Sequence, residues 1–195
     1  MNTDSMQLLS SMLALFAAGG SLVLLVAHLF GRSGNGAAAN FVQAFRPVAL
    51  PLAALVAGFA MFGSLWFSEA ANYNPCKLCW YQRSAMYPLA ILLVTALVRR
   101  WWAGRHAPNE NGDAYRSQRE IMPYAIVLAS VGCVVSTYHY LLEWNPTWES
   151  NVCAIDVPCT TIWFREFGFV TLSFMALCGF VSIIILLATT YRSES

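Results

Sequence analysis

The chain has 195 residues, of which 58% are hydrophobic and only 11% are charged. An ordinary soluble domain carries about 25% charged residues, so this composition excludes a typical water-soluble domain and favours a protein solvated by lipid. The length favours a single domain. The net charge of +1 gives no reason to expect nucleic acid or another acidic partner.

Five apolar segments are each long enough to cross a bilayer, which takes about 20 helical residues. They must be helices, because lipid offers the backbone no hydrogen bonds. We predict an all-α membrane protein, a four-helix transmembrane bundle plus one additional N-terminal transmembrane helix. The predicted spans are 6–30, 48–67, 79–98, 121–142 and 167–190. Residues 1–47 then form the extra helix with its connector, and residues 48–195 form the four-helix unit.

The arginines predict the orientation in the membrane. Connectors 31–46 and 99–120 and the C-terminal tail together carry eight arginines, whereas the opposite side has only Lys77, Arg83 and Arg165. Because basic residues collect in cytoplasmic loops, we expect the N-terminus outside and the C-terminus in the cytoplasm.

Four of the six cysteines form two short-spaced pairs on the predicted outer side. The first pair is Cys76 and Cys79, where Asn74 suits an N-cap and Pro75 suits the first helical position. Both thiols would then lie near the positive end of a helix dipole, which favours the nucleophilic thiolate. Alone, this motif is only moderately specific, since a static disulfide or half of a zinc site has the same pattern.

The second pair, Cys153 and Cys159, lies in the loop before the last span and would alone be interpreted as a loop staple. Two pairs on one oxidising membrane face favour disulfide chemistry over a four-thiolate zinc site, so we expect no metal. Cys133 and Cys178 lie inside apolar spans and are interpreted as packing residues.

Two polar residues inside the spans are further site candidates. Arg83 follows Cys79 by four residues and shares its helix face one turn deeper. A charge there is costly and usually functional, although a side chain near the interface can also snorkel to the headgroups. We expect Arg83 to stabilise a thiolate at Cys79 and an anionic reduced acceptor. His139 is either a satisfied interfacial residue or a hydrogen-bond partner for that acceptor.

The run from Cys76 to Arg83, Cys-Lys-Leu-Cys-Trp-Tyr-Gln-Arg, resembles the DsbB family of disulfide bond formation proteins. The likeness covers about residue 48 to the end and includes the loop pair and the Phe-Gly-Phe-Val-Thr-Leu run at 167–172. It implies a multi-pass thiol oxidase in the bacterial inner membrane, with its active cysteines on the periplasmic side.

By the same resemblance, a DsbA-like thioredoxin-fold partner would exchange its thiols with Cys153. Cys159 would communicate with Cys76, and Cys79 would face a membrane quinone, ubiquinone or menaquinone, with Arg83 beside it. Re-oxidising a DsbA-type partner at about −120 mV requires an acceptor more oxidising than the glutathione pool, and a lipid-soluble quinone meets that need.

The resemblance also implies that His139 lines the quinone site. The chain departs from the best-known members in its short loop spacing, its additional first span, and Ser173 in place of a proline found in many relatives. The short loop resembles the Gram-positive-type branch.

Three other interpretations stay open. In a vitamin K epoxide reductase-like enzyme the loop pair precedes the Cys-x-x-Cys motif, the reverse of the order here, so it ranks second. An electron importer of the CcdA kind keeps its working cysteines within the spans. The remaining class is a non-enzymatic Cys/His metal-binding membrane protein.

Overall fold

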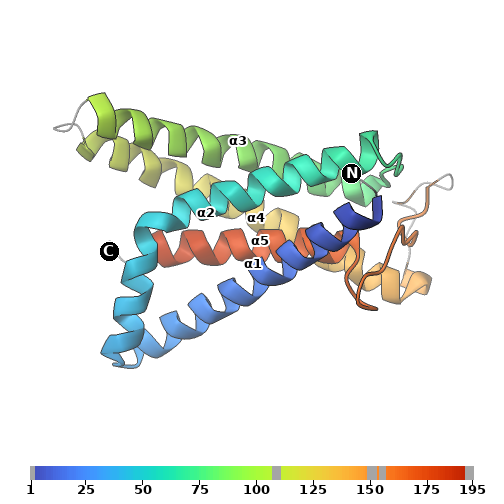
Figure 1. Ribbon diagram of the computed structural model, residues 1–195, viewed down its shortest axis with the longest axis horizontal. Helices are drawn as coiled ribbons and strands as arrows, with labels where there is room; N and C mark the ends of the chain where they lie inside the picture. The colour runs from blue at the N-terminus through green and yellow to red at the C-terminus, as the bar shows by residue number, and fades with distance from the viewer. Residues whose placement is uncertain (1–2, 107–110, 149–152, 154–156, 192–195) are drawn as a thin grey trace.

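The computed structural model describes residues 3–106, 111–148, 153 and 157–191. Five α-helices, each long and apolar enough to cross a membrane, account for most of these residues (Figure 1). In the described part of the chain the only β-type pairing is an isolated bridge, so the predicted all-α membrane fold is confirmed. The elements are α1 (Thr3–Arg32), α2 (Gly36–Glu69), α3 (Lys77–His106), α4 (Asn111–Trp144), the short 3₁₀ turn η2 (Pro146–Trp148) and α5 (Leu172–Tyr191).

Helix α5 is the centre of the bundle and contacts α1, α2, α4 and, over a shorter stretch, α3. Its sequence suits this place, since it carries no charged residue and its Phe180, Ile183 and Leu187 are fully buried. The outer helices keep bulky apolar side chains on their outer faces, such as Phe16 at 83% and Val134 at 70% exposure. Such faces are stable only against lipid, because water would have to solvate them.

Helices extend beyond the predicted spans at the arginine-rich end. The side chain of Asn35 accepts a hydrogen bond from the backbone N–H of Ala37 at 3.2 Å and caps α2, so the predicted connector 31–46 is mostly helical. Pro47 and Pro51 lie inside α2. Proline removes a helical hydrogen bond and clashes with the preceding turn, which accounts for the bend of α2 in Figure 1.

The predicted start of the last span at residue 167 is wrong. Phe167 and Gly168 have φ values of 51° and 81°, in the left-handed region that cannot continue an α-helix. They form a tight turn, and α5 begins at Leu172, where the Thr171 hydroxyl accepts a hydrogen bond from the N–H of Phe174 at 3.3 Å. The turn brings the preceding loop back over the end of the bundle.

Candidate active site

The first cysteine pair is built into the start of α3. Cys76 is the N-cap: its carbonyl accepts from the N–H of Trp80 at 3.1 Å, and its sulfur accepts from the N–H of Cys79 at 3.3 Å. The prediction of Asn74 as the cap is therefore wrong, because the chain becomes helical only at Lys77. Both sulfurs still lie at the positive end of the helix, 3.0 Å apart.

His139 of α4 lies between the two cysteine pairs. Its Nε2 is 3.7 Å from the sulfur of Cys76 and 3.0 Å from the carbonyl oxygen of Cys159. Its Nδ1 is 3.3 Å from the amide nitrogen of Gln82. Because that amide donates to Nδ1, the ring proton of the neutral imidazole belongs on Nε2, where it is shared by the sulfur and the carbonyl.

This arrangement makes Cys76 the nucleophilic sulfur of the helix pair in its reduced state. The hydrogen bond from the Cys79 thiol lowers the pKa of Cys76 to about 4, and His139 also lowers it, against the opposing effect of burial. The thiolate is the form that attacks a disulfide. Its side chain is only 6% exposed, so that attack is directed to neighbours within the protein.

The second pair forms a disulfide, with the sulfurs of Cys153 and Cys159 2.07 Å apart. Cys159 is 1% exposed and packs with Cys76 and Leu142 in one buried cluster, whereas Cys153 is half-buried at the edge of that cluster. The structure thus brings all four predicted cysteines together. Residues 149–152 and 154–156 of this loop lie outside the described residues.

The metal-binding alternative has a partial ligand set. The thiols of Cys76 and Cys79 and the ring of His139 offer ligand atoms within 4.8 Å of one another. A structural zinc ion takes four protein ligands, and the two loop sulfurs bonded to each other offer no thiolate. The donor set therefore favours disulfide exchange over a closed zinc site.

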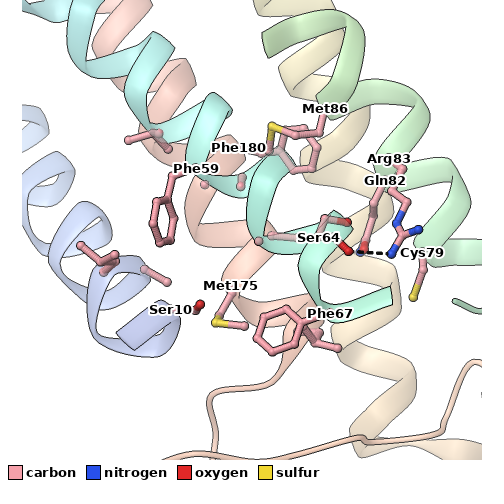
Figure 2. A pocket seen from close by; sticks show the side chains of 18 of the residues that line it. Ser10, Phe59, Ser64, Phe67, Cys79, Gln82, Arg83, Met86, Met175 and Phe180 are labelled. Carbon is pink, nitrogen blue, oxygen red and sulfur yellow. Dashed lines mark hydrogen bonds between the residues drawn. The ribbon is translucent and has the colours of Figure 1, made fainter. Parts of the chain in front are cut away.

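A cavity of about 450 Å³ lies beside the helix pair, walled by α1, α2, α3 and α5. It occupies the space between α1 and α3, which do not pack on each other in the described part of the chain. Most of its lining is apolar, and its polar groups include Cys79, Gln82 and Arg83 of α3 (Figure 2). This is the size and character of a site for an apolar small molecule with a polar head.

The cavity opens toward the lipid-facing surface at α1 and α2. Phe16 of α1 and Leu55 of α2 both line it, yet their side chains are 83% and 65% exposed. A lipid-soluble molecule therefore has an apolar route from the bilayer into the cavity.

Arg83 is part of the cavity wall. Its guanidinium donates a hydrogen bond to the backbone carbonyl of Ser64 in α2 at 3.0 Å and lies 5.5 Å from the ring centre of Trp80 (Figure 2). Within the described residues no carboxylate pairs with Arg83. The guanidinium is thus held between α2 and α3, with an unneutralised charge at the cavity.

Cys79 lines two spaces at once. It borders the 450 Å³ cavity, and it also borders a space of about 20 Å³ that it shares with Cys76 and His139. His139 lines the small space and not the larger cavity, to whose wall it is linked through its contact with Gln82. Cys79 is therefore the group that connects the cysteine cluster to the cavity.

Sequence reasoning missed a buried acid beside the cluster. Glu143 is 8% exposed; one carboxylate oxygen accepts a hydrogen bond from Ser173 at 2.7 Å, and the other has no partner. It borders the same small space as His139. The available signal was its spacing, four residues after His139 on one helix face.

Comparison with known proteins identifies the class of this membrane protein. The sequence profile of the family described as Disulfide bond formation protein DsbB matches residues 46–191. The chain therefore belongs to the DsbB family and is a multi-pass inner membrane protein with a disulfide oxidoreductase role. Helix α1 lies outside the matched region.

Particular relatives are named as disulfide formation proteins too. The chain is 35% identical over 142 residues to Disulfide bond formation protein C of Bacillus subtilis (strain 168), covering 72% of this chain and 91% of the relative. It is 35% identical over 138 residues to Probable disulfide formation protein C 2 of Bacillus anthracis, covering 71% and 86%. It is 38% identical over 125 residues to Probable disulfide formation protein C 1 of the same organism, covering 64% and 78%. No solved structure matches the chain.

Proposed function

We propose that this chain is a quinone-dependent thiol oxidase that re-oxidises a DsbA-like thioredoxin-fold partner on the periplasmic side of the membrane. The observation that carries the proposal is the position of Cys79. Its side chain borders both the cysteine cluster and the apolar cavity, so electrons delivered to the cluster reach the cavity through one residue.

Electrons enter at the loop pair. A thiolate of the reduced partner attacks the sulfur of Cys153, the Cys153–Cys159 bond breaks, and Cys159 leaves as a thiolate. The partner's second thiol then attacks the mixed disulfide and releases oxidised partner. The half-buried position of Cys153 suits attack from outside, whereas buried Cys159 faces His139 and the helix pair.

The helix pair receives the electrons in a second exchange. The Cys159 thiolate attacks an oxidised Cys76–Cys79 pair at Cys76, Cys79 leaves as a thiolate, and Cys153 closes the loop disulfide again. The described state, with free thiols at Cys76 and Cys79 and a loop disulfide, corresponds to the product of this step. Arg83 and the helix dipole stabilise the departing thiolate.

The residues around the cavity fit a quinone. The volume, the apolar lining, the opening to lipid and the charge of Arg83 suit an uncharged ring that becomes anionic on reduction. A quinone bound there would accept the two electrons and two protons released when Cys76 and Cys79 form a disulfide. Arg83 and Gln82 would hold its head beside Cys79.

The proposed orientation places the cluster outside and the arginine-rich end in the cytoplasm. Gln7, near the N-terminus, donates a hydrogen bond to the Tyr73 hydroxyl at 2.7 Å, so the N-terminus and the cysteines share one end of the bundle. Arg99 and Arg100 lie on the far part of α3. In a Cys133→Ala/Cys178→Ala background, membrane-impermeant maleimide should label reduced Cys153 on intact cells. Labelling only after permeabilisation would reverse the orientation.

The activity is tested by anaerobic mixing of purified protein, a reduced thioredoxin-fold oxidant and a short-chain quinone. We expect one quinone to be reduced per partner disulfide formed, with absorbance and thiol titration as measurements. Partner oxidation without quinone reduction would leave the disulfide role intact and refute the quinone.

The entry point is tested by trapping. In Cys159→Ala, with a partner that lacks its resolving cysteine, a covalent adduct should accumulate on non-reducing gels and disappear with dithiothreitol. Adding Cys153→Ala should abolish the adduct, whereas adding Cys76→Ala should not. An adduct that requires Cys76 instead would place electron entry at the helix pair.

A further inference from the structure

We propose that α1, the helix outside the family match, is part of the acceptor site, and that Ser10 donates a hydrogen bond to the acceptor oxygen farther from Cys79. The inference rests on the proposed quinone function and assigns a specificity-determining residue to it. It begins from a polar atom that the fold itself leaves without a partner.

Ser10 lines the cavity and is only 8% exposed, yet its hydroxyl has no hydrogen-bond partner. Serines in a helix usually satisfy themselves by donating to a carbonyl one turn back, as Ser21 does to Ala17 at 2.7 Å and Ser130 to Ile126 at 2.8 Å. Ser10 makes no such bond. Its donor is therefore available to a molecule in the cavity.

Helix α1 is fixed as a wall of the cavity near its outer end. Ser11 donates to the sulfur of Met175 in α5 at 3.7 Å, and the Gln7 side chain donates to the Tyr73 hydroxyl at 2.7 Å. Tyr73 stacks on Trp163 with ring centres 4.7 Å apart, and both residues line the cavity. The position of Ser10 is thus held by the residue that follows it and by the turn that precedes it.

The polar groups of α1 and of α3 lie on opposite sides of the cavity, and most of the lining between them is apolar. Figure 2 shows Ser10 on α1 at one side and Cys79 and Arg83 on α3 at the other. A para-quinone carries its two carbonyl oxygens at opposite ends of the ring. One oxygen would lie at Arg83 and the other would accept from Ser10, which fixes both the orientation of the ring and its distance from Cys79.

The test uses the fully oxidised full-length protein, which binds a quinone without reducing it. Calorimetric titration compares a dimethyl-naphthoquinone, which has two carbonyls, with tetralone, which keeps the fused rings but has one. Wild-type protein should bind the quinone more tightly. Ser10→Ala should weaken quinone binding roughly three- to tenfold, the loss of one hydrogen bond, and leave tetralone binding unchanged.

Ser182→Ala is the matched control. Ser182 is also a buried helix serine without a partner, at 1% exposure, but it lies in α5 away from the cavity. It should leave both affinities unchanged. Equal loss of quinone and tetralone binding in Ser10→Ala, or no loss of either, would overturn the role of Ser10.

A second pair of variants tests the wall itself. Ala14 lines the cavity, whereas the exposed Gly19 has open space at its Cβ position. Ala14→Phe should abolish quinone binding while oxidation of up to two equivalents of partner, one for each cysteine pair, is kept; Gly19→Phe should leave both unchanged. Full quinone binding in Ala14→Phe would remove α1 from the site. Absence of quinone binding in the wild-type protein would instead refute the proposed function itself.

Discussion

The two cysteine pairs are held in place by different kinds of contacts. Cys76 and Cys79 are fixed at a helix start by the N-cap hydrogen bonds and by His139. Cys159 is buried in a cluster with Cys76 and contacts His139 through its carbonyl, whereas Cys153 is half-buried at the edge of that cluster. Helix placement favours a stable thiolate near a fixed acceptor, while a loop can present a disulfide to a partner. On the proposed function, this difference suits the first pair to the inner reaction, the reduction of the quinone, and the second pair to the outer reaction, exchange with the partner.

The largest expected effect is the loss of turnover when a cysteine of either pair is replaced, and the two pairs differ in which half of the reaction is lost. Alanine at Cys79 or Cys153 should abolish steady-state turnover. Cys79→Ala should still oxidise one equivalent of reduced partner, because its loop disulfide is intact, whereas Cys153→Ala should oxidise none. Rapid-quench thiol titration measures the difference. The Cys133→Ala/Cys178→Ala control should keep most activity, and a burst in Cys153→Ala would contradict the assignment.

Variants of Arg83 test the inner reaction, quinone reduction, without affecting exchange with the partner. Arg83→Ala should raise the quinone KM roughly 10- to 100-fold, the range for losing a charged hydrogen-bond partner, and should leave exchange with the partner unchanged. Arg83→Lys should restore only part of the loss, since a point charge replaces a planar fork. Steady-state kinetics with quinone varied measures both. Unchanged quinone dependence in the two variants would return Arg83 to a snorkelling role.

Replacing His139 tests how much this residue contributes to the lowered pKa of Cys76. The pKa of Cys76 is lowered to about 4, so the thiolate is present above that pH and is lost as the pH falls through it. The ultraviolet absorbance of the thiolate in the reduced protein should therefore stay near its plateau at pH 6. His139→Phe should move the fall to higher pH, though only in part, because the larger contribution from Cys79 remains. An unshifted profile would exclude the histidine contribution.

The smallest expected effect is on stability and concerns the buried hydrogen bond between Ser173 and Glu143. Ser173→Ala leaves both carboxylate oxygens of buried Glu143 without a side-chain partner. We expect a loss of about 1–3 kcal/mol in unfolding free energy, or roughly 2–12 °C in Tm. Thermal unfolding in detergent measures it. Ser173→Ala/Glu143→Leu should recover part of the loss, and an unchanged Tm in Ser173→Ala would contradict this role of the bond.

The sequence predicted the features that follow from hydropathy and local spacing. The five spans, the helix placement of the Cys76 pair and the position of Arg83 one turn deeper all depend on one helix at a time. The start of α5 was missed because the turn depends on the left-handed conformation of Phe167, which an aromatic residue rarely adopts.

Features made by three or more helices were not predictable in the same way. The cavity exists because α1 and α3 are held apart by α2 and α5, and no motif encodes that separation. The place of His139 depends on how α4 meets α3 and the loop, so its sequence position near the outer interface did not distinguish the cysteines from the cavity. Nothing in the sequence distinguishes Ser10 from other helix serines, and only the structure shows that its buried hydroxyl has no hydrogen-bond partner.

The contact of α1 with α5 has a consequence for biogenesis. Helix α1 packs against α5, which follows it far along the chain, and both line the cavity beside Cys79. A nascent chain that has inserted α1 to α3 already exposes a Cys-x-x-Cys pair but has no closed cavity beside it. On the proposed function, electrons can therefore pass to the acceptor only after α5 has been inserted against α1.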